Sequence, residues 1–272
     1  MKIVDCFTFY NELDLLNYRL NILNNYVDYF VLVEATYTHN GERKKLYYNE
    51  NKHLFTQFQD KIIHIIVEDF QYKYPNIDYS KNEQWTNEKF QRNCIKNGIE
   101  LLNLTDEDII TITDLDEIPD PTIFKQVKNG DLIIDINILN MDLYYYNLNS
   151  KLTINWTHAK ILSYNKFKEL SMNCDEIRFY NFTNPCNIIL NGGWHLSFFG
   201  DSNFIQNKIH KYAHQELNVE PITNIQNIEY HINNFTDIIN RNNMNIIKLP
   251  IKNNTYLPPE YERFLKKFIV VY

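Results

Sequence analysis

A buried strand runs into a pair of acidic residues in Ile109-Ile110-Thr111-Ile112-Thr113-Asp114-Leu115-Asp116-Glu117-Ile118-Pro119. The β-branched run at its start favours a strand, and the proline is expected to end it. Alternation along a strand turns Asp114 and Asp116 to the same side, with Leu115 facing away. Two neighbouring carboxylates are costly unless a cation lies between them. The pattern predicts a divalent metal site at the end of a strand, where ligands bind in open α/β sheets. An acidic turn is the alternative, because Asp and Pro are common in turns.

The chain before this stretch alternates strand and helix signals. We expect strands over 3–9, 29–33 and 62–67, and helices over 13–23 and 51–58. Ser80-Lys-Asn-Glu83 has the form of a capping box and predicts a long helix from there to about residue 102. Asp120-Pro121 predicts the start of another helix. This order indicates an α/β fold with a mostly parallel, Rossmann-like central sheet and helices on both faces.

From residue 132 the pattern changes to longer apolar and aromatic strands. We expect strands over 141–147 and 156–163, a glycine-bounded aromatic segment over 192–200, and a helix over 202–216. The remainder is rich in Asn and Pro and predicts an irregular C-terminal wrap. Because no repeat and no Gly/Ser-rich linker interrupts the chain, the simplest organisation is a single domain over 1–272.

Composition excludes several classes of function. The 272 residues carry a net charge of −7, which argues against nucleic acid as the main partner. The apolar runs are too short to cross a membrane, so a soluble, cytoplasmic chain with reduced cysteines is expected. With six glycines and no phosphate-binding loop motif, a metal ion is expected to neutralise any bound phosphate.

Other polar and aromatic residues end neighbouring strands and could complete a nucleotide site. Phe7, Phe9 and Tyr10 close the first strand and could stack on a base. Glu34 closes the second strand, where its carboxylate either accepts from a nucleoside or caps a turn. In the predicted long helix, Glu88 and Arg92 share a face, either as a surface ion pair or with the arginine aimed at phosphate.

His195 lies between two apolar residues after two glycines. Its imidazole is either a third metal ligand beside the two aspartates or a hydrogen-bonded core residue. His210 and His214 are spaced four residues apart with Glu216 nearby, but no recognised zinc motif contains them, so a zinc site is not expected.

Five ordered segments resemble glycosyltransferase family 17, and together they extend from residue 3 to about residue 216. They are DCFTFYNELDLL (5–16), VLVEATYTHNG (31–41), WTNEKFQRN (85–93), TDLDEIP (113–119) and GWHLSFFG (193–200).

This resemblance implies a GT-A fold and an inverting transfer of a sugar, with N-acetylglucosamine the expected one, from a UDP-sugar to a glycan. Residues 1–131 would form the nucleotide-sugar half, and 132–272 the acceptor half and C-terminal wrap. Asp114 and Asp116 would match the family's metal motif, with Mn²⁺ or Mg²⁺ as the ion. Glu34, Lys44, Glu88 and Arg92 fall in segments expected to line the donor site. Without a membrane anchor, a soluble viral or microbial enzyme acting on a surface glycan or lipid-linked sugar is expected.

An inverting transfer needs a carboxylate that deprotonates the acceptor hydroxyl while a metal stabilises the departing diphosphate. Asp142 is the first candidate for this base, with Asp175, Glu176 and Glu117 behind it. A sugar-stacking wall is expected from four aromatic residues, for which core packing is the competing role. These are Tyr144, Tyr145, Trp156 and Trp194.

Two other classes of function stay open at this point. One is a glycan-binding protein that keeps the fold and has lost catalysis. The other is a hydrolase or pyrophosphorylase of sugar nucleotides on the same scaffold.

Overall fold

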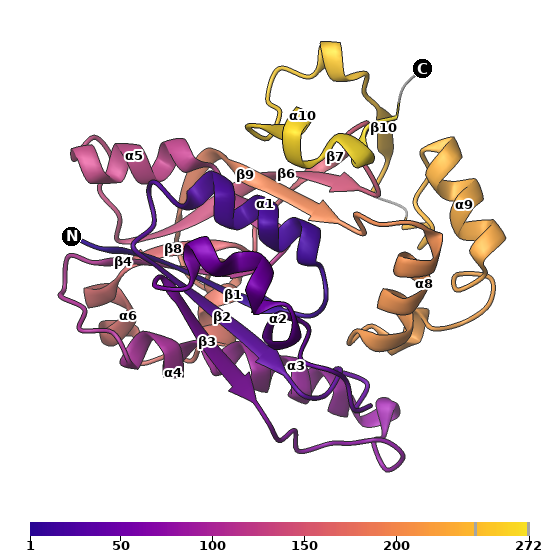
Figure 1. Cartoon of the computed structure of the whole chain (residues 1–272), viewed down its shortest axis with the longest axis horizontal. Helices are drawn as coiled ribbons and strands as arrows, with labels where there is room; N and C mark the ends of the chain where they lie inside the picture. The colour runs from indigo at the N-terminus through magenta and orange to yellow at the C-terminus, as the bar shows by residue number, and fades with distance from the viewer. Residues whose placement is uncertain (242–243, 271–272) are drawn as a thin grey trace.

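The computed structural model describes residues 1–241 and 244–270, and its centre is a ten-stranded sheet (Figure 1). The strands are β1 (Ile3–Phe9), β2 (Tyr29–Ala35), β3 (Ile62–Val67), β4 (Ile109–Asp114), β5 (Glu117–Pro119), β6 (Ile136–Tyr145), β7 (Ser150–Trp156), β8 (Lys160–Ser163), β9 (Asn187–Ser197) and β10 (Ile246–Lys248).

The sheet order is β10-β7-β6-β8-β4-β1-β2-β3, with β9 paired to β6 and β5 paired to β9. The block β4-β1-β2-β3 is parallel throughout, which confirms the prediction for the first half of the chain. Strands of the second half continue the sheet through antiparallel pairs, apart from the parallel pair of β6 and β9. The molecule is therefore a mixed α/β protein with a Rossmann-like parallel block.

Helices cover both faces of this sheet (Figure 1). The α-helices are α1 (Leu13–Leu23), α2 (Tyr47–Glu50), α3 (Glu83–Asn93), α4 (Ile95–Glu100), α5 (Pro121–Asn129), α6 (Tyr164–Leu170), α7 (Cys174–Arg178), α8 (Ser202–Lys211), α9 (Ile225–Asn234) and α10 (Tyr261–Phe264). Short 3₁₀ turns are η1 (Lys52–Phe58), η2 (Tyr79–Lys81), η3 (Tyr180–Phe182), η4 (Gln215–Leu217), η5 (Ile251–Asn253) and η6 (Lys266–Phe268).

Alternation along β1 supplies both layers of the core. Phe7 points into the cluster that α1 and α5 cover, and Cys6 points into the cluster beneath α4 and α7. A third apolar cluster joins the ends of β6 and β9 to α8 and α9. The charged groups at the carboxyl ends of β1, β2 and β4 thus lie above a core that is closed on both sides.

Several predictions for the first half differ from the structure. The helix expected over 51–58 is the 3₁₀ helix η1, and the strand expected over 29–33 extends to Ala35 as β2. The long helix is divided at Cys94, whose N–H is shared between the carbonyls of Phe90 and Gln91 and so tightens the turn. The predicted capping box is wrong: Asp78 caps η2 through the Ser80 N–H, and the Glu83 carboxylate accepts from the Asp78 N–H.

The second half departs further from the prediction. The expected strand over 156–163 is two strands, β7 and β8, because Lys160 Nζ gathers the carbonyls of Thr157, His158 and Arg178 at 2.9 Å each. The predicted C-terminal wrap contains α9 and β10, and the helix over 202–216 ends at Lys211. No helix in the described parts of the chain is long and apolar enough to cross a membrane.

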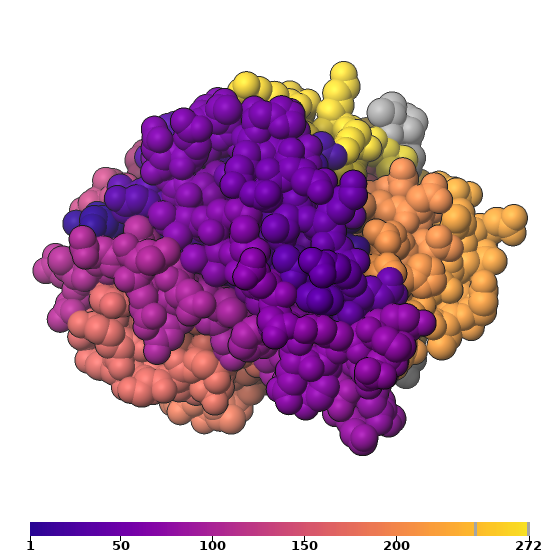
Figure 2. Space-filling model, turned by 60° about the horizontal axis from the view of Figure 1, so that its bottom comes forward, coloured from indigo at the N-terminus to yellow at the C-terminus, as the bar shows by residue number. Residues whose placement is uncertain are grey.

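Helix α8 lies against the first half of the chain, although it is far from it in sequence (Figure 2). Asn40 Nδ2 donates to the His210 carbonyl at 2.9 Å, and Lys211 pairs with Glu42. These contacts bring α8 beside the carboxyl ends of the parallel strands.

Candidate active site

A cavity of about 700 Å³ opens at the carboxyl ends of β1, β2 and β4. Its lining includes Asp114, Asp116 and Glu117 from the end of β4 and the turn after it, together with residues of α3, α8 and β7. This volume is typical of a site for a small ligand. The cavity therefore lies where the topology of an α/β sheet favours ligand binding.

Arg19 of α1 builds the turn that carries the two aspartates. Its guanidinium is fully buried, pairs with Asp5 at 2.7 Å, and donates to the carbonyls of Asp114, Leu115 and Glu117 at 2.8 to 3.0 Å. Strand β4 ends at Asp114, so Asp116 lies in this turn and strand alternation does not set its direction. Both aspartates line the cavity, but each faces different partners.

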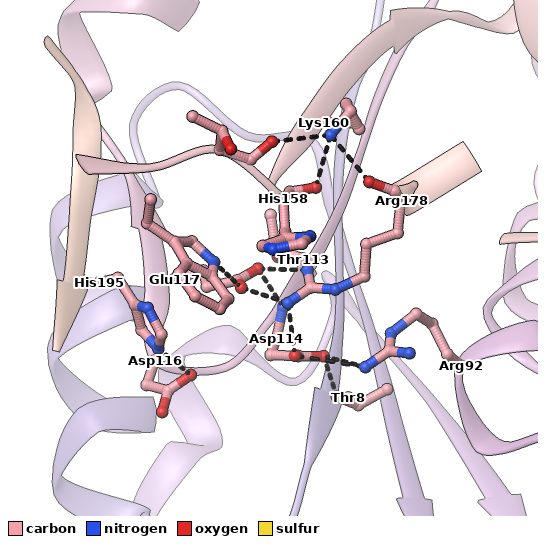
Figure 3. A network of polar contacts seen from close by, with 12 residues as sticks. Thr8, Arg92, Thr113, Asp114, Asp116, Glu117, His158, Lys160, Arg178 and His195 are labelled. Atoms are coloured by element: carbon pink, nitrogen blue, oxygen red, sulfur yellow. Dashed lines mark hydrogen bonds and ion pairs between the residues drawn. The ribbon is translucent and has the colours of Figure 1, made fainter. Parts of the chain in front are cut away.

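Asp114 faces two arginines (Figure 3). Its carboxylate lies 2.9 Å from Arg178 and 3.3 Å from Arg92, and it accepts from the Thr8 hydroxyl at 2.8 Å. Burial alone would raise the pKa of Asp114, but Arg178 and Arg92 hold it well below its ordinary value. Asp114 is therefore ionised and bound to cations of the chain itself.

Glu117 is completely buried and joins three parts of the fold. Arg178 Nη1 donates to Oε2 at 2.6 Å and Nη2 reaches Oε1, so the pair is bidentate. The Trp156 indole and the Asp114 N–H also donate to this carboxylate. Arg92, which contacts Asp114, also forms ion pairs with Glu88 and Asp175. We call these residues the arginine cluster: Arg92, Arg178, Glu88, Asp114, Glu117 and Asp175.

Asp116 faces helix α8. Lys208 Nζ lies 3.0 Å from Asp116 and 3.0 Å from Glu12, and His195 Nε2 lies 3.5 Å from Asp116. Burial would raise the pKa of Asp116, but Lys208 and His195 hold it well below its ordinary value. We call Asp116, Glu12, Lys208 and His195 the α8 contact.

His195 reaches this position because β9 passes very close to β5. Gly193 has φ +137°, and a Cβ there would lie 2.1 Å from the Ile118 carbonyl oxygen. Only glycine allows this approach. The antiparallel pairing of β5 with β9 places His195 opposite Glu117, the residue directly after Asp116.

The donor atoms of this site fit a divalent metal ion only in part. Among residues 1–241 and 244–270, no group of three or more His, Cys, Asp or Glu side chains is arranged to hold one. Asp114 is paired with the arginines and Asp116 with Lys208, but Asp116 also lies beside His195 and both face the cavity. A carboxylate and an imidazole suit Mn²⁺, whose remaining ligands would be water and diphosphate oxygens.

Aromatic side chains line the cavity on both sides of Asp116. Phe9, Tyr10 and Tyr37 lie at or after the ends of β1 and β2. Trp156 ends β7 and His158 lies in the loop between β7 and β8, on the other side of β4 in the sheet order. A charged centre between two aromatic walls suits a ligand that carries phosphate and rings.

Most predicted donor-site residues meet in this cavity. The lining contains Phe9, Tyr10, Lys44, Glu88, Arg92, Asp114, Asp116 and His195. Phe7 lies instead in the core, under the Arg19 guanidinium. Glu34 is also fully buried, where it accepts from the Tyr48 N–H at 3.0 Å and lies 3.1 Å from His64.

Of the four carboxylates predicted as the base, Glu117 lines the cavity and the other three lie elsewhere. Asp142 pairs with Lys151, at 2.5 Å, on β6 and β7. Asp175 pairs with Arg92, also at 2.5 Å, as a member of the arginine cluster. Glu176 closes a capping box with Asn173 at the start of α7. The structure places all three outside the cavity lining.

The expected sugar-stacking wall is also divided by the structure. Tyr145 and Trp156 line the cavity. Tyr144 and Trp194 are core residues, and the Trp194 indole donates to the Tyr256 carbonyl at 3.1 Å.

Four residues of the site were missed by sequence reasoning: Arg19, Arg178, Lys208 and Glu12. Arg19 could have been recognised from the sequence, because it interrupts the apolar stripe of α1 beside Leu16, Leu20 and Leu23. An arginine on a buried helix face requires an acidic or carbonyl partner. Arg178 and Lys208 come from short helices of the second half, and nothing in their local sequence marks them.

The fold and cavity define an α/β protein with a charged cavity at the ends of its parallel strands. A family model described as glycosyltransferase family 17 matches residues 1–243. The chain therefore belongs to glycosyltransferase family 17, an enzyme family, which confirms the resemblance seen in its sequence.

The chain is also similar to mammalian beta-1,4-mannosyl-glycoprotein 4-beta-N-acetylglucosaminyltransferases. It is 27% identical to the enzymes of Rattus norvegicus and Homo sapiens and 26% identical to that of Mus musculus. Each match extends over 135 residues, which are 47% of this chain and 24% of the relative. The chain thus covers about a quarter of the length of these relatives.

Proposed function

We propose that the chain is a metal-dependent, inverting glycosyltransferase of GT-A fold. It would transfer N-acetylglucosamine from a UDP-sugar to a glycan acceptor. The observation that supports this most directly is the cavity centre, where Asp116 and His195 lie beside Arg178, Arg92 and Lys208. Cations and metal ligands that converge on one point suit a departing diphosphate. The mammalian relatives, by their names, transfer N-acetylglucosamine.

Each half of the single catalytic domain would bind a different substrate. Residues 1–131 supply Phe9, Tyr10 and Lys44 at the ends of the parallel strands, and these would hold the nucleotide. Residues 132–272 supply Trp156 and His195 and would face the acceptor.

Asp116 and His195 are the residues that would hold the metal ion, which when bound supplies positive charge to the diphosphate. Arg178 and Lys208 keep their charge, since the pKa of each is raised by its acidic neighbours despite burial. Arg19 fixes the turn beneath them, so these groups need little rearrangement during transfer.

The general base of this reaction must reach an acceptor hydroxyl in the cavity. Glu12, Glu88 and Glu216 line the cavity, unlike the three carboxylates considered first, although Glu12 is paired with Lys208 and Glu88 with Arg92. Glu117 also lines it, but its oxygens are taken up by Arg178 and Trp156.

The test is release of UDP from UDP-N-acetylglucosamine by the purified chain with Mn²⁺, with EDTA, and in Asp116→Ala. Asp60→Ala is the matched control, because Asp60 is exposed and outside the cavity. We expect loss of about 100-fold or more in Asp116→Ala and in EDTA, and no change in the control.

Each other outcome identifies an alternative. Release that persists in EDTA and in Asp116→Ala contradicts the metal-dependent mechanism. Free sugar or sugar phosphate as the product, with no new glycosidic bond, indicates a hydrolase or pyrophosphorylase. No binding of any UDP-sugar, together with binding of glycans, indicates a glycan-binding protein.

A further inference from the structure

Four aromatic side chains form a continuous surface on the β8 side of the cavity. We call Trp156, His158, Phe179 and Phe182 the aromatic shelf. The His158 ring lies 4.4 Å from Trp156, 5.2 Å from Phe179 and 5.3 Å from Phe182, centroid to centroid. The first three of these residues line the cavity, and Phe182 extends the shelf outward.

The outer half of the shelf is exposed. Phe179 has 43% of its surface accessible and Phe182 has 62%, and their centroids lie 6.0 Å apart. Single exposed apolar residues are ordinary on a protein surface. Two neighbouring phenylalanines that continue a ligand cavity are less ordinary, and they offer ring faces to whatever enters it.

The shelf also has a polar group without a partner. His158 Nδ1 is buried and makes no hydrogen bond within the part of the chain that the structure describes. Burial, assisted by Arg178, lowers the pKa of His158 to about 4, so the imidazole is neutral at pH 7. A neutral imidazole can donate to or accept from a hydroxyl group.

The position of the shelf separates it from the proposed nucleotide side. The sheet order places β8 on one side of β4 and β1, β2 and β3 on the other. Trp156 lies 4.5 Å from the His195 ring, which contacts Asp116. The shelf therefore begins at the metal-binding pair and leads away from Phe9 and Tyr10.

We propose that the aromatic shelf binds a pyranose ring of the acceptor glycan. A pyranose has apolar C–H faces that pack on aromatic rings, and hydroxyl groups that need hydrogen-bond partners. The shelf supplies the ring faces, and His158 supplies an imidazole whose Nδ1 has no partner among the described residues. The neighbouring Arg178 is already paired with Asp114 and Glu117. This proposal rests on the proposed function and assigns the acceptor side of that site. The donor's own sugar has the same chemistry, so the experiment must separate the two sources.

The test compares Phe179→Ala, Phe182→Ala and the double variant with the wild type. Tyr230→Ala is the matched control, because Tyr230 is an aromatic residue with 59% exposure outside the cavity. Titration calorimetry first measures the affinities for UDP and UDP-N-acetylglucosamine with Mn²⁺. Saturation-transfer NMR then measures binding of chitobiose, mannotriose, lactose and cellobiose to the UDP-loaded protein. Thermal unfolding confirms that each variant is folded.

We expect at least one oligosaccharide to bind, and its affinity to fall about tenfold or more in the double variant. Affinities for UDP and UDP-N-acetylglucosamine should stay unchanged in all variants, and Tyr230→Ala should bind like the wild type. Loss of affinity for UDP-N-acetylglucosamine, with that for UDP unchanged, would assign the shelf to the donor sugar and overturn the proposal.

Failure of the shelf and failure of the proposed function give different results. No oligosaccharide binding by the wild type, or equal binding by the double variant, overturns the shelf while leaving UDP binding intact. Absence of UDP and UDP-sugar binding in the wild type counts against the transferase, whatever the oligosaccharides do.

Discussion

The arginine cluster and the α8 contact are two charged regions of one cavity, and they are built differently. In the arginine cluster, two guanidiniums serve four carboxylates, and all of them are held by β4, β5, α3 and α7. In the α8 contact, one lysine serves two carboxylates and joins α8 to the turn after β4. The first region is a network of several ion pairs among two strands and two helices, whereas the second depends on a single lysine of α8. We therefore expect that a bound cation could replace the charge of Lys208 but not those of the arginines.

Arg178→Met is expected to give the largest effect of this comparison. It leaves the buried Glu117 carboxylate without its cation, and such losses cost about 3–5 kcal/mol of unfolding free energy. Urea unfolding of the wild type and Arg178→Met at pH 7 measures this loss of unfolding free energy. Addition of Mn²⁺ should not restore the lost stability, and restoration would mean that the two regions are equivalent.

Lys208→Met should cost less, about 1–2 kcal/mol, because Asp116 and Glu12 lie at the cavity and can be hydrated. Here Mn²⁺ should restore stability, since a metal ion bound at the proposed site of the folded state would replace the missing charge. Calorimetry should also show tighter Mn²⁺ binding in Lys208→Met than in the wild type. Lys211→Met is the control, because Lys211, at the C-terminal end of the same helix, pairs with Glu42 and not with Asp116 or Glu12.

Trp156→Phe tests the link between the arginine cluster and the aromatic shelf. It removes one hydrogen bond to Glu117 and keeps an aromatic ring, so a loss of about 1 kcal/mol is expected. The measurement is urea unfolding beside that of Trp85→Phe, a cavity tryptophan on α3 away from Glu117. An equal loss in both variants would show that the indole bond contributes nothing.

The smallest effect concerns pH. Because burial lowers the folded-state pKa of His158 to about 4, below its ordinary 6.5, the folded state binds fewer protons than the unfolded state between these values. The unfolding free energy should therefore fall as the pH is lowered from 6.5 towards 4. His158→Gln should lack this part of the slope. The unfolding free energies of the two proteins are measured in urea at pH 4.5, 5.5, 6.5 and 7.5. Their difference isolates the contribution of His158, since the carboxylates contribute to both proteins.

The parallel block could be predicted from sequence because its signals are local. β-branched runs and helical spacing placed β1, α1 and β3 at their observed boundaries. The acidic pair after β4 was found for the same reason, together with the neighbouring strand ends that line the cavity. Side-chain directions in the turn after β4 were not predictable, because Arg19 sets them from another element.

The second half was harder because its structure depends on distant contacts. The division between β7 and β8 follows from a buried lysine that collects carbonyls from two segments. Arg178 and Lys208 reach the cavity only after α7 and α8 pack on the first half of the chain. The hydrophobic periodicity of a sequence does not encode contacts between distant segments. The cations that balance the acidic pair were therefore found only in the structure.

Lys208 acts as a tethered counter-ion. A dissolved cation leaves an acidic site when it is diluted or chelated, whereas an ammonium group fixed to α8 remains at high effective concentration. Asp116 and Glu12 therefore never face each other as uncompensated charges, even when no metal ion is present. Chelation should stop sugar transfer and leave the melting temperature nearly unchanged. If the proposed metal dependence holds, we expect the protein to stay folded during purification in EDTA and to become active when metal is added.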